Sequence, residues 1–398
     1  MKKILFTNVG FKNYAGSEIA TMTLANYFLR TNYEVHIFTI EYGEPLRKIV
    51  DKKIKVITLK NIEMLSDEYD LIWSHHFPLL DYILFCKKVH AKKIFFESLS
   101  YKLPIEAFPI YYKSLSLTGV VSPRVKKALA DKGFDTSESY ILPNYATQEC
   151  FDIDYSHNSK VKKIIIVSNH LPNELNDFAN IAANNGIEVD IFGMGYRVEF
   201  ITPELLAQYD VVISIGKTIF YSLAIGIPSY TYDENVSIGY ITMENIEENL
   251  KNNFANWNGY SPKKPEQIFS EIIGNYNKIL QDSRPLKEFA FNTFRMDDLL
   301  NDICQKLEMA PEIDYEKLYE EYKTLEYTSS LYVEDLAFAK SEIMQWYNKS
   351  LELGTLYQEE IQKSVTYHSM YQQTHKELMA VLNSKGWKFL EKIRKIKK

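Results

Sequence analysis

A glycine, a lysine and a threonine in the second half of the chain are suited to binding a phosphate. Gly216, Lys217 and Thr218 follow the apolar run Asp210–Ser214 and open an apolar helical stretch. A glycine lets the backbone approach a ligand closely. The start of a helix attracts an anion, and a lysine adds a full positive charge. The alternative is an ordinary strand-to-helix turn with a solvated lysine, but an unpaired lysine in such apolar surroundings would be costly. We therefore favour phosphate binding.

The loop after the first apolar run has a glycine at each end. Gly10 follows the run Ile4–Asn8, and Gly16 and Ser17 open the next helical stretch, residues 16–30. Free backbone N–H groups at the start of a helix can hold a phosphate or a sugar hydroxyl. Ser17 could instead simply cap the helix. The glycine spacing does not match the dinucleotide-binding pattern G-x-G-x-x-G.

Two histidines and a glutamate end neighbouring apolar runs in the first half. His75 and His76 follow the run Leu71–Ser74, and Glu97 follows the run Lys93–Phe96. Parallel strands end at one edge of a sheet, where ligands bind, so these residues are candidate catalytic groups. A histidine or a carboxylate there can act as a base. Each histidine could equally be structural, and Glu97 could be a loop cap.

A fourth polar group follows the first apolar run of the second half. Ser168, Asn169 and His170 end the run that begins at Lys163. We expect them at the edge of a second sheet, where they are candidate ligand contacts. A structural role for His170 remains the alternative.

The segments that must position these groups alternate between short apolar runs and helical patterns. Continuous apolar runs predict strands buried on both faces, and alternation with helices predicts parallel pairing. The alternation continues to Leu142, is interrupted by the polar stretch Asp152–Lys162, and restarts at Lys163. We therefore predict an α/β fold with two Rossmann-like domains, 1–155 and 156–310, that face a cleft.

The chain changes character after Pro311. Apolar residues from Leu318 to Ile343 recur in steps of three and four, which predicts a helical extension over 311–383. This extension either pairs as a coiled coil, and so forms a homo-oligomer, or is a helical appendage.

A basic segment, 384–398, ends the sequence. It holds seven basic residues against one acidic residue, and the spacing of Trp387, Leu390, Ile393 and Ile396 gives it one apolar edge. Such a helix can lie on an anionic membrane surface. A solvated tail, or a helix docked on the acidic remainder of the chain, is the alternative.

The composition narrows the class of protein. The 398 residues include 46 Lys and Arg against 52 Asp and Glu, so the net charge of -6 argues against nucleic acid as a partner. Three distant cysteines suggest a reducing cytosol rather than disulfides. The apolar run at the N-terminus is too short for a signal peptide, and no apolar stretch is long enough to span a membrane. We expect a cytoplasmic protein, peripheral at the inner face of the cell membrane if the basic segment binds there.

Taken in order, these motifs resemble those of GT-B glycosyltransferases, particularly family-4-like enzymes of bacterial surface-polysaccharide synthesis, over about residues 1–300. The matching fragments are Gly16-Ser17-Glu18, Val121-Ser122-Pro123, Leu142-Pro143-Asn144-Tyr145, Asp210–Ser214, Gly216-Lys217-Thr218 and Leu223–Pro228.

The resemblance implies transfer of a sugar from a nucleotide-sugar to a glycan or lipid-linked acceptor. It implies no metal ion and no cofactor, because helix starts and Lys217 would stabilise the nucleoside diphosphate that leaves. His75, His76 or Glu97 would be the base of an inverting reaction. The donor-binding residues would be Gly16, Ser17, Ser168, Asn169, His170, Phe200, Ile201, Thr202, Gly216, Lys217 and Thr218, with the nucleobase near Phe200 and Ile201.

Two departures from the family pattern keep other functions open. The family usually carries two glutamates separated by seven residues, and here those positions fall on Ile213 and Tyr221. The arginine and lysine that commonly follow the interdomain linker are absent too. A catalytically silent GT-B protein that acts as a scaffold through its helical extension is one alternative. A sugar-nucleotide epimerase, which shares the two-domain fold, is another.

Overall fold

The computed structural model describes residues 1–233, 236–255, 261–328, 373, 376 and 379–380. The chain divides into two compact units, residues 1–319 and residues 320–398. Most of the predicted helical extension and the whole basic segment 384–398 lie outside the described residues. The coiled-coil and membrane-binding interpretations of these segments stay predictions.

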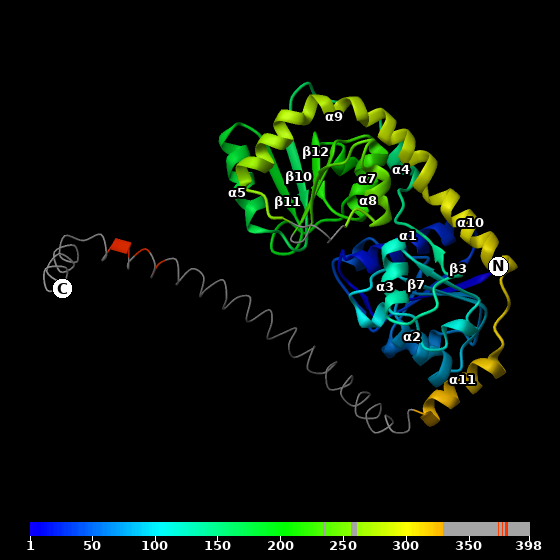
Figure 1. The fold of residues 1–398 in the computed structure, drawn as a ribbon. Coiled ribbons are helices and arrows are strands. Elements are labelled where there is room, and N and C mark those ends of the chain that lie inside the picture. Colours follow the sequence, from blue (N-terminus) through cyan, green and yellow to red (C-terminus); the bar gives the residue numbers. More distant parts are fainter. Residues whose placement is uncertain (234–235, 256–260, 329–372, 374–375, 377–378, 381–398) are drawn as a thin grey trace, which may run out of the picture. The chain divides into compact units, whose positions relative to one another are not determined.

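The first half of the chain forms a seven-stranded parallel sheet, as the sequence predicts (Figure 1). One of its inner strands carries Ile4, Leu5 and Phe6, all fully buried, as expected for a strand covered on both faces. The strands, in the order in which they pair, are β5 (Lys55–Ile57), β3 (Glu34–Phe38), β1 (Lys3–Thr7), β6 (Glu68–Ser74), β7 (His90–Ser98), β8 (Leu117–Val120) and β9 (Tyr140–Ile141). A separate two-stranded pair is formed by β2 (Gly10–Phe11) and β4 (Glu41–Tyr42).

Two segments of the first half form short helical turns. The stretch 78–89 is a five-residue α-helix followed by a π-helical turn, Tyr82–Cys86, in which three consecutive apolar residues are buried. The stretch 112–117 is a single 3₁₀ turn, because the chain is extended again from Leu115. The helices of this half are α1 (Gly16–Arg30), α2 (Phe77–Asp81), α3 (Pro123–Asp131) and α4 (Gln148–Asp152).

The second half repeats the architecture with a five-stranded sheet. Its first four strands are parallel, and the last pairs antiparallel with its neighbour. The strands, in the order in which they pair, are β11 (Glu188–Phe192), β10 (Lys163–Val167), β12 (Val211–Ser214), β13 (Ser229–Asp233) and β14 (Val236–Tyr240). The helices are α5 (Asn173–Asn184), α6 (Pro203–Leu206), α7 (Lys217–Ile225) and α8 (Ile246–Lys251).

Two helices lead the chain back from the second half to the first. The long α9 (Pro265–Phe294) packs against α5 and α7, and α10 (Met296–Met309) then runs along the first domain (Figure 1). The apolar side chains of α10, among them Met296, Leu300 and Ile303, belong to the core cluster of the first sheet. The sequence pattern places α10 within the second predicted domain, 156–310. Its apolar face packs instead in the core of the first domain.

The chain stays on the first domain after α10 and begins α11 (Tyr315–Thr328) there. The Tyr315 hydroxyl accepts a hydrogen bond from the Ala91 N–H at 2.5 Å, and the Tyr319 ring lies 5.9 Å from the Phe85 ring. Leu318, the first of the apolar residues that recur from 318 to 343 in the sequence, is fully buried. The start of the helical extension is therefore packed on the first domain.

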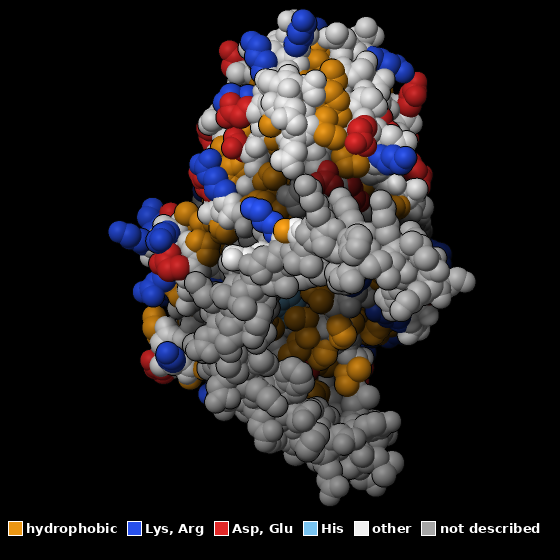
Figure 2. All heavy atoms as spheres, turned by 90° about the vertical axis from the view of Figure 1, so that its left-hand side faces the viewer, with side chains coloured by type: hydrophobic (Ala, Val, Ile, Leu, Met, Phe, Trp, Pro, Cys, Tyr) orange, Lys and Arg blue, Asp and Glu red, His pale blue; other side chains and the backbone are white. Residues whose placement is uncertain are grey.

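Charged and hydrophobic side chains are both visible on the face that Figure 2 shows. Lys, Arg, Asp and Glu side chains are spread over the upper part and the left of the lower part, and hydrophobic side chains are visible between them. Leu103 and Ile110 are among the most exposed apolar residues of the first domain. None of the described helices combines the length and the apolar character that crossing a membrane requires.

Candidate functional site

Polar side chains gather where β1, β6 and β7 end in the first sheet. Asn8 follows β1, His75 and His76 follow β6, and Glu97 lies near the end of β7; all four are buried. The Thr7 hydroxyl donates a hydrogen bond to the Ser74 hydroxyl at 2.7 Å. The parallel strands thus bring together the predicted catalytic residues, but beneath the surface rather than on an open edge.

The two histidines have different environments. The Nδ1 atom of His76 accepts a hydrogen bond from the Val9 N–H at 2.9 Å, and its Nε2 atom lies 3.5 Å from the Glu106 carboxylate. His75 is fully buried, and neither ring nitrogen has a hydrogen-bond partner among the described residues. Burial, helped by the neighbouring His76, lowers the pKa of His75 to about 3. Two polar contacts fix the His76 ring. The His75 ring is neutral, and its nitrogens form no hydrogen bond with the described residues.

Glu97 lies beside His75. Its Oε2 atom accepts a hydrogen bond from the Trp73 indole N–H at 2.9 Å and is 3.6 Å from Nδ1 of His75. Burial raises the pKa of Glu97 to about 8, although the Trp73 hydrogen bond and the charge of Lys217 both lower it. A carboxyl group with that pKa can accept or release a proton close to physiological pH.

Lys217 reaches from the second domain to the first. It is the first residue of α7, after Gly216, whose φ of 56° lies in the left-handed region that glycine readily adopts. The Lys217 amine donates a hydrogen bond to the Thr23 hydroxyl of α1 at 3.0 Å. Its nitrogen lies 5.1 Å from the centre of the Tyr145 ring. Burial lowers the pKa of Lys217 to about 7, against the raising effect of Glu97.

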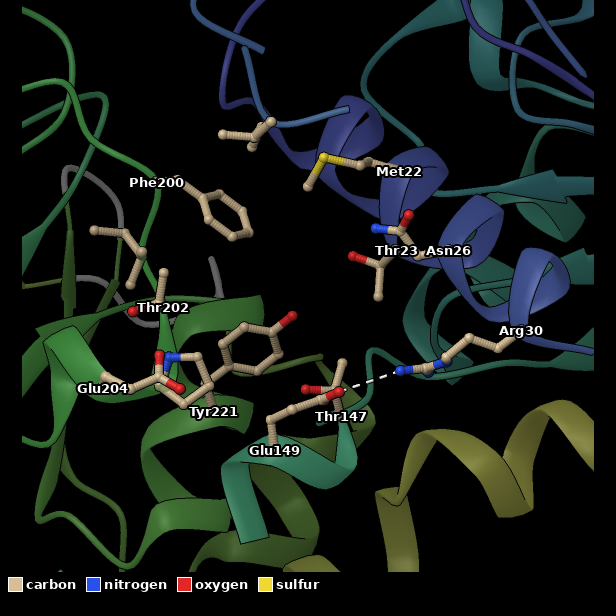
Figure 3. A pocket seen from close by; sticks show the side chains of 13 residues that line it. Met22, Thr23, Asn26, Arg30, Thr147, Glu149, Phe200, Thr202, Glu204 and Tyr221 are labelled. Carbon is tan, nitrogen blue, oxygen red and sulfur yellow. Dashed lines mark hydrogen bonds and ion pairs between the residues drawn. The ribbon is translucent and has the colours of Figure 1, made fainter. Parts of the chain in front are cut away.

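A cavity of about 310 Å³ lies beside this lysine, between α1 and the second domain (Figure 3). In Figure 3 the Tyr221 side chain points from α7 toward Thr23 and Asn26. The lining residues are Met22, Thr23, Asn26 and Arg30 of α1, Ile49, Thr147, Glu149, Phe200, Ile201, Thr202, Pro203, Glu204 and Tyr221.

Three of the predicted donor-binding residues line the cavity, together with several residues that the sequence did not indicate. Phe200, Ile201 and Thr202 line the cavity, and their contact with a nucleobase stays a prediction. The α1 residues were missed, because α1 carries several polar residues and nothing in the sequence distinguishes Thr23 from the others. Tyr221 was noted only as a departure from a family pattern.

Two of the predicted donor-binding residues lie at the start of α1, where Glu18 dominates the local structure. The Glu18 carboxylate accepts hydrogen bonds from the backbone N–H groups of Lys12 at 2.8 Å and Asn13 at 3.0 Å. Ala15, not Ser17, is the N-cap residue. The loop before Gly16 is therefore fixed by a carboxylate of its own helix, which occupies N–H groups that could otherwise bind an anion.

The loop after β10 contains the predicted residues Ser168, Asn169 and His170, and it contacts neighbouring loops at the end of the second sheet. The Ser168 hydroxyl donates to the Asp233 carboxylate and accepts from the His170 N–H, both at 3.0 Å. Gly193 crosses these residues so closely that a Cβ atom would lie 1.8 Å from the Ser168 carbonyl oxygen. These three residues and Thr218 are not among those that line the cavity.

The comparisons with known proteins concern the fold. No family model and no curated protein matches this sequence. A structure of HepE from Anabaena with UDP and glucose bound is similar at a TM-score of 0.54 and 14% identity, covering 78% of this chain and 100% of HepE. A structure of S. aureus TarM with fondaparinux, alpha-GlcNAc-glycerol and UDP is similar at a TM-score of 0.53 and 10% identity, covering 77% of this chain and 100% of TarM. The two Rossmann-like domains, the cavity between them and these similarities together identify the fold of this chain as GT-B.

Proposed function

We propose that this protein transfers a sugar from a nucleotide-sugar to a hydroxyl of a glycan or lipid-linked acceptor in surface-polysaccharide synthesis. The observation that carries the proposal is the cavity between α1 and the second domain, with the Lys217 amine beside it. Structures of HepE hold UDP and glucose, or UDP-glucose, as bound molecules, which makes a nucleotide-sugar the donor to test first.

On the donor side, the nucleobase would lie against Phe200, Ile201 and Thr202 in the cavity. The leaving nucleoside diphosphate would be stabilised by Lys217 and by the N-terminus of α7, because negative charge develops on the phosphates as the sugar leaves. In this proposal a protein cation does the work that a metal ion does in other transferases, and no cofactor takes part.

On the acceptor side, Glu97 is the better base for an inverting transfer. Its pKa of about 8 is close to the pH at which the enzyme would work, whereas the pKa of His75 is about 3. Efficient general bases have a pKa near the working pH. His75 remains a predicted hydrogen-bonding residue for the reacting sugars; its ring is fully buried, and both ring nitrogens lack partners among the described residues. His76 would position the loop after β1 through Val9.

A screen of nucleotide-sugars tests the function. The purified protein is incubated with UDP-, GDP-, ADP- and CDP-sugars, and binding, sugar release and isomerisation are measured separately. A transferase binds one of them and slowly releases its sugar to water. An epimerase isomerises its donor without an acceptor. Absence of binding and turnover with every donor would contradict the proposal.

The second candidate is a catalytically silent GT-B protein that acts as a scaffold. The observation that favours it is the pair of residues at the family's glutamate positions. Ile213 is fully buried within β12, and Tyr221 lines the cavity with a phenol whose pKa burial raises strongly. Neither side chain supplies a carboxylate. Nucleotide-sugar binding without any turnover in the screen would support this candidate.

We further propose that residues 384–398 attach the protein to the inner face of the cell membrane. The proposal rests on the basic and apolar pattern of this segment in the sequence. The full chain should sediment with vesicles that contain anionic lipid, and increasingly so with their anionic content, whereas a chain that ends at Asn383 should stay in the supernatant. Salt should weaken the binding, because exposed charges are screened. Equal sedimentation of both chains would contradict the proposal.

A further inference from the structure

The polar atom of a buried tryptophan contacts the candidate base. Trp73 of β6 is fully buried, and its indole N–H donates a hydrogen bond to Oε2 of Glu97 at 2.9 Å. In the parallel register of β6 and β7, Trp73 lies opposite Phe95. Residues two apart in a strand share a face, so Glu97 follows Phe95 on the face that carries the Trp73 ring. The pairing of the two strands therefore brings the indole to the carboxyl group.

Three aromatic rings fix the orientation of the Trp73 indole. The Phe95 ring packs edge-on with its centre 4.6 Å away, and the centres of the Phe28 and Phe6 rings lie at 6.0 Å and 6.2 Å. Side chains in so closely packed a core are held in one arrangement. The direction of the indole N–H is thus set by the core, and Glu97 lies in that direction.

Glu97 could serve only to satisfy the indole, because a buried tryptophan N–H needs a hydrogen-bond acceptor. A neutral acceptor, such as the oxygen of a glutamine, would meet that need without burying a group that can ionise, which is costly. The sequence instead has a glutamate at this position, and it is 3% exposed. An acid here fits a role that uses its proton.

The two oxygens of Glu97 differ in their contacts. Oε2 takes the Trp73 hydrogen bond and lies 3.6 Å from Nδ1 of His75. Oε1 accepts no hydrogen bond from a described residue, yet it is not among the fully enclosed polar atoms that lack a partner. An indole N–H only donates, so it cannot take a proton from Glu97. Oε1 is therefore the oxygen that remains for an acceptor hydroxyl.

We propose that Trp73 is a positioning residue for this base. Its N–H holds Oε2 of Glu97, which fixes the plane of the carboxyl group and leaves Oε1 to the acceptor hydroxyl. In the transfer step the acceptor O–H proton passes to Oε1, the acceptor oxygen bonds to the anomeric carbon of the sugar, and the bond from that carbon to the nucleoside diphosphate breaks. The electron pair of that bond leaves with the diphosphate. The inference rests on the proposed function, in which Glu97 is the base of an inverting transfer.

The same hydrogen bond favours the ionised form of Glu97, because an N–H donor stabilises a negative charge. Burial raises the pKa of Glu97 to about 8, and the Trp73 hydrogen bond is the largest effect that lowers it, ahead of the charge of Lys217. Without the indole N–H, a smaller fraction of Glu97 would be ionised at neutral pH.

The test titrates Glu97 directly. The protein is prepared with an isotope label at the δ-carbon of glutamate, and the NMR signal of Glu97 is assigned by its loss in Glu97→Gln. In the wild type this signal should titrate near pH 8. Trp73→Phe should raise the pKa by about one unit or more, the shift that corresponds to a lost hydrogen bond to a charged group. A tryptophan analogue with sulfur in place of the indole nitrogen, introduced at position 73 by stop-codon suppression, should give the same shift without leaving a cavity.

Turnover supplies a second readout. A pKa raised by about one unit leaves about a tenth as much ionised Glu97 at pH 7, so the turnover rate there should fall about 10-fold. The loss should shrink at higher pH, where the carboxyl group is ionised in both proteins. The KM for the donor should change little, because Trp73 is not among the residues that line the cavity. A role in packing alone would lower the rate equally at every pH.

Phe28→Leu is the matched control. Phe28 also packs on Trp73 in the core of the first sheet, but its side chain has no donor for Glu97. The variant should unfold at a lower temperature and keep the Glu97 pKa unchanged. An unchanged pKa with the sulfur analogue, or an equal shift in Phe28→Leu, overturns this inference and leaves the proposed function standing. Absence of turnover with every donor overturns the proposed function, and the role of Glu97 and Trp73 in transfer with it.

Discussion

Replacing Lys217 with alanine should weaken the binding of the donor nucleotide at least ~10-fold, the effect expected when a hydrogen bond to a charged group is lost. The physical reason is the place of this amine at the start of α7, beside the cavity and within reach of Thr23. The measurement is the dissociation constant of UDP, or of whichever nucleoside diphosphate binds the wild type. Lys163→Ala is the control, since Lys163 pairs with Glu188 at the surface of the same domain. An unchanged dissociation constant for Lys217→Ala would refute the role.

The pH dependence of binding provides a second readout for Lys217. Its pKa of about 7 means that the amine carries a proton below pH 7 and loses it as the pH rises. A phosphate binds the protonated form, so this contribution to affinity should fall as the pH rises above 7. Lys217→Arg keeps its charge over this range, and its affinity relative to the wild type should therefore increase from pH 6.5 to pH 8.5. A constant ratio between the two proteins would contradict the assigned pKa effect.

Replacing Glu97 with glutamine should lower the rate of sugar transfer by about 100- to 10 000-fold, the usual contribution of a general base. Glutamine keeps the shape of the side chain and an oxygen that can accept the Trp73 hydrogen bond, but it cannot take a proton. Because the base is the ionised carboxylate, the Glu97 contribution to the wild-type turnover rate should rise with pH up to about 8. Loss of the Lys217 proton above pH 7 lowers the rate, so the profile should be bell-shaped with its maximum between pH 7 and pH 8. The variant should lose this rise. The rate is measured as release of nucleoside diphosphate from the donor identified by the screen.

Glu106→Gln is the matched control for this experiment. Glu106 is also a buried carboxyl group of the first domain, but it lies 3.5 Å from His76 rather than beside His75. It should keep most of the activity and the same pH profile. Equal losses in the two variants would mean that burial of any carboxyl at this sheet edge matters, and that Glu97 has no role of its own as a base.

The parts of the structure that the sequence predicts well are those that depend on local patterns. Continuous apolar runs such as Ile4–Asn8 become strands, and α1 has the predicted bounds Gly16–Arg30. The residues that follow strands, among them His75 and Lys217, lie at sheet ends because parallel strands all end at the same edge. Local periodicity and the rules of parallel sheets are sufficient for this much.

The parts that were missed depend on contacts between distant residues. Burial of His75 follows from how the loops after several strands fold over the sheet, which no single stretch of sequence encodes. Thr23 and Tyr221 line one cavity although about two hundred residues separate them. The loop before Gly16 is predicted to hold a phosphate or a sugar hydroxyl, but the Glu18 carboxylate accepts hydrogen bonds from N–H groups of that loop. Competition between a side chain and a ligand for the same backbone donors is visible only in three dimensions.

The return of α10 to the first domain has a consequence for the order in which the protein folds. The core of the first sheet includes Met296, Leu300, Ile303 and Leu307, and the Tyr27 hydroxyl of α1 donates a hydrogen bond to Asn301 at 3.0 Å. Chains are synthesised from the N-terminus, and domains generally fold as they emerge. Here the first domain leaves the ribosome without the α10 side chains of its core, which follow only after the whole second domain has been synthesised. The domain that is translated first is therefore the last to be completed.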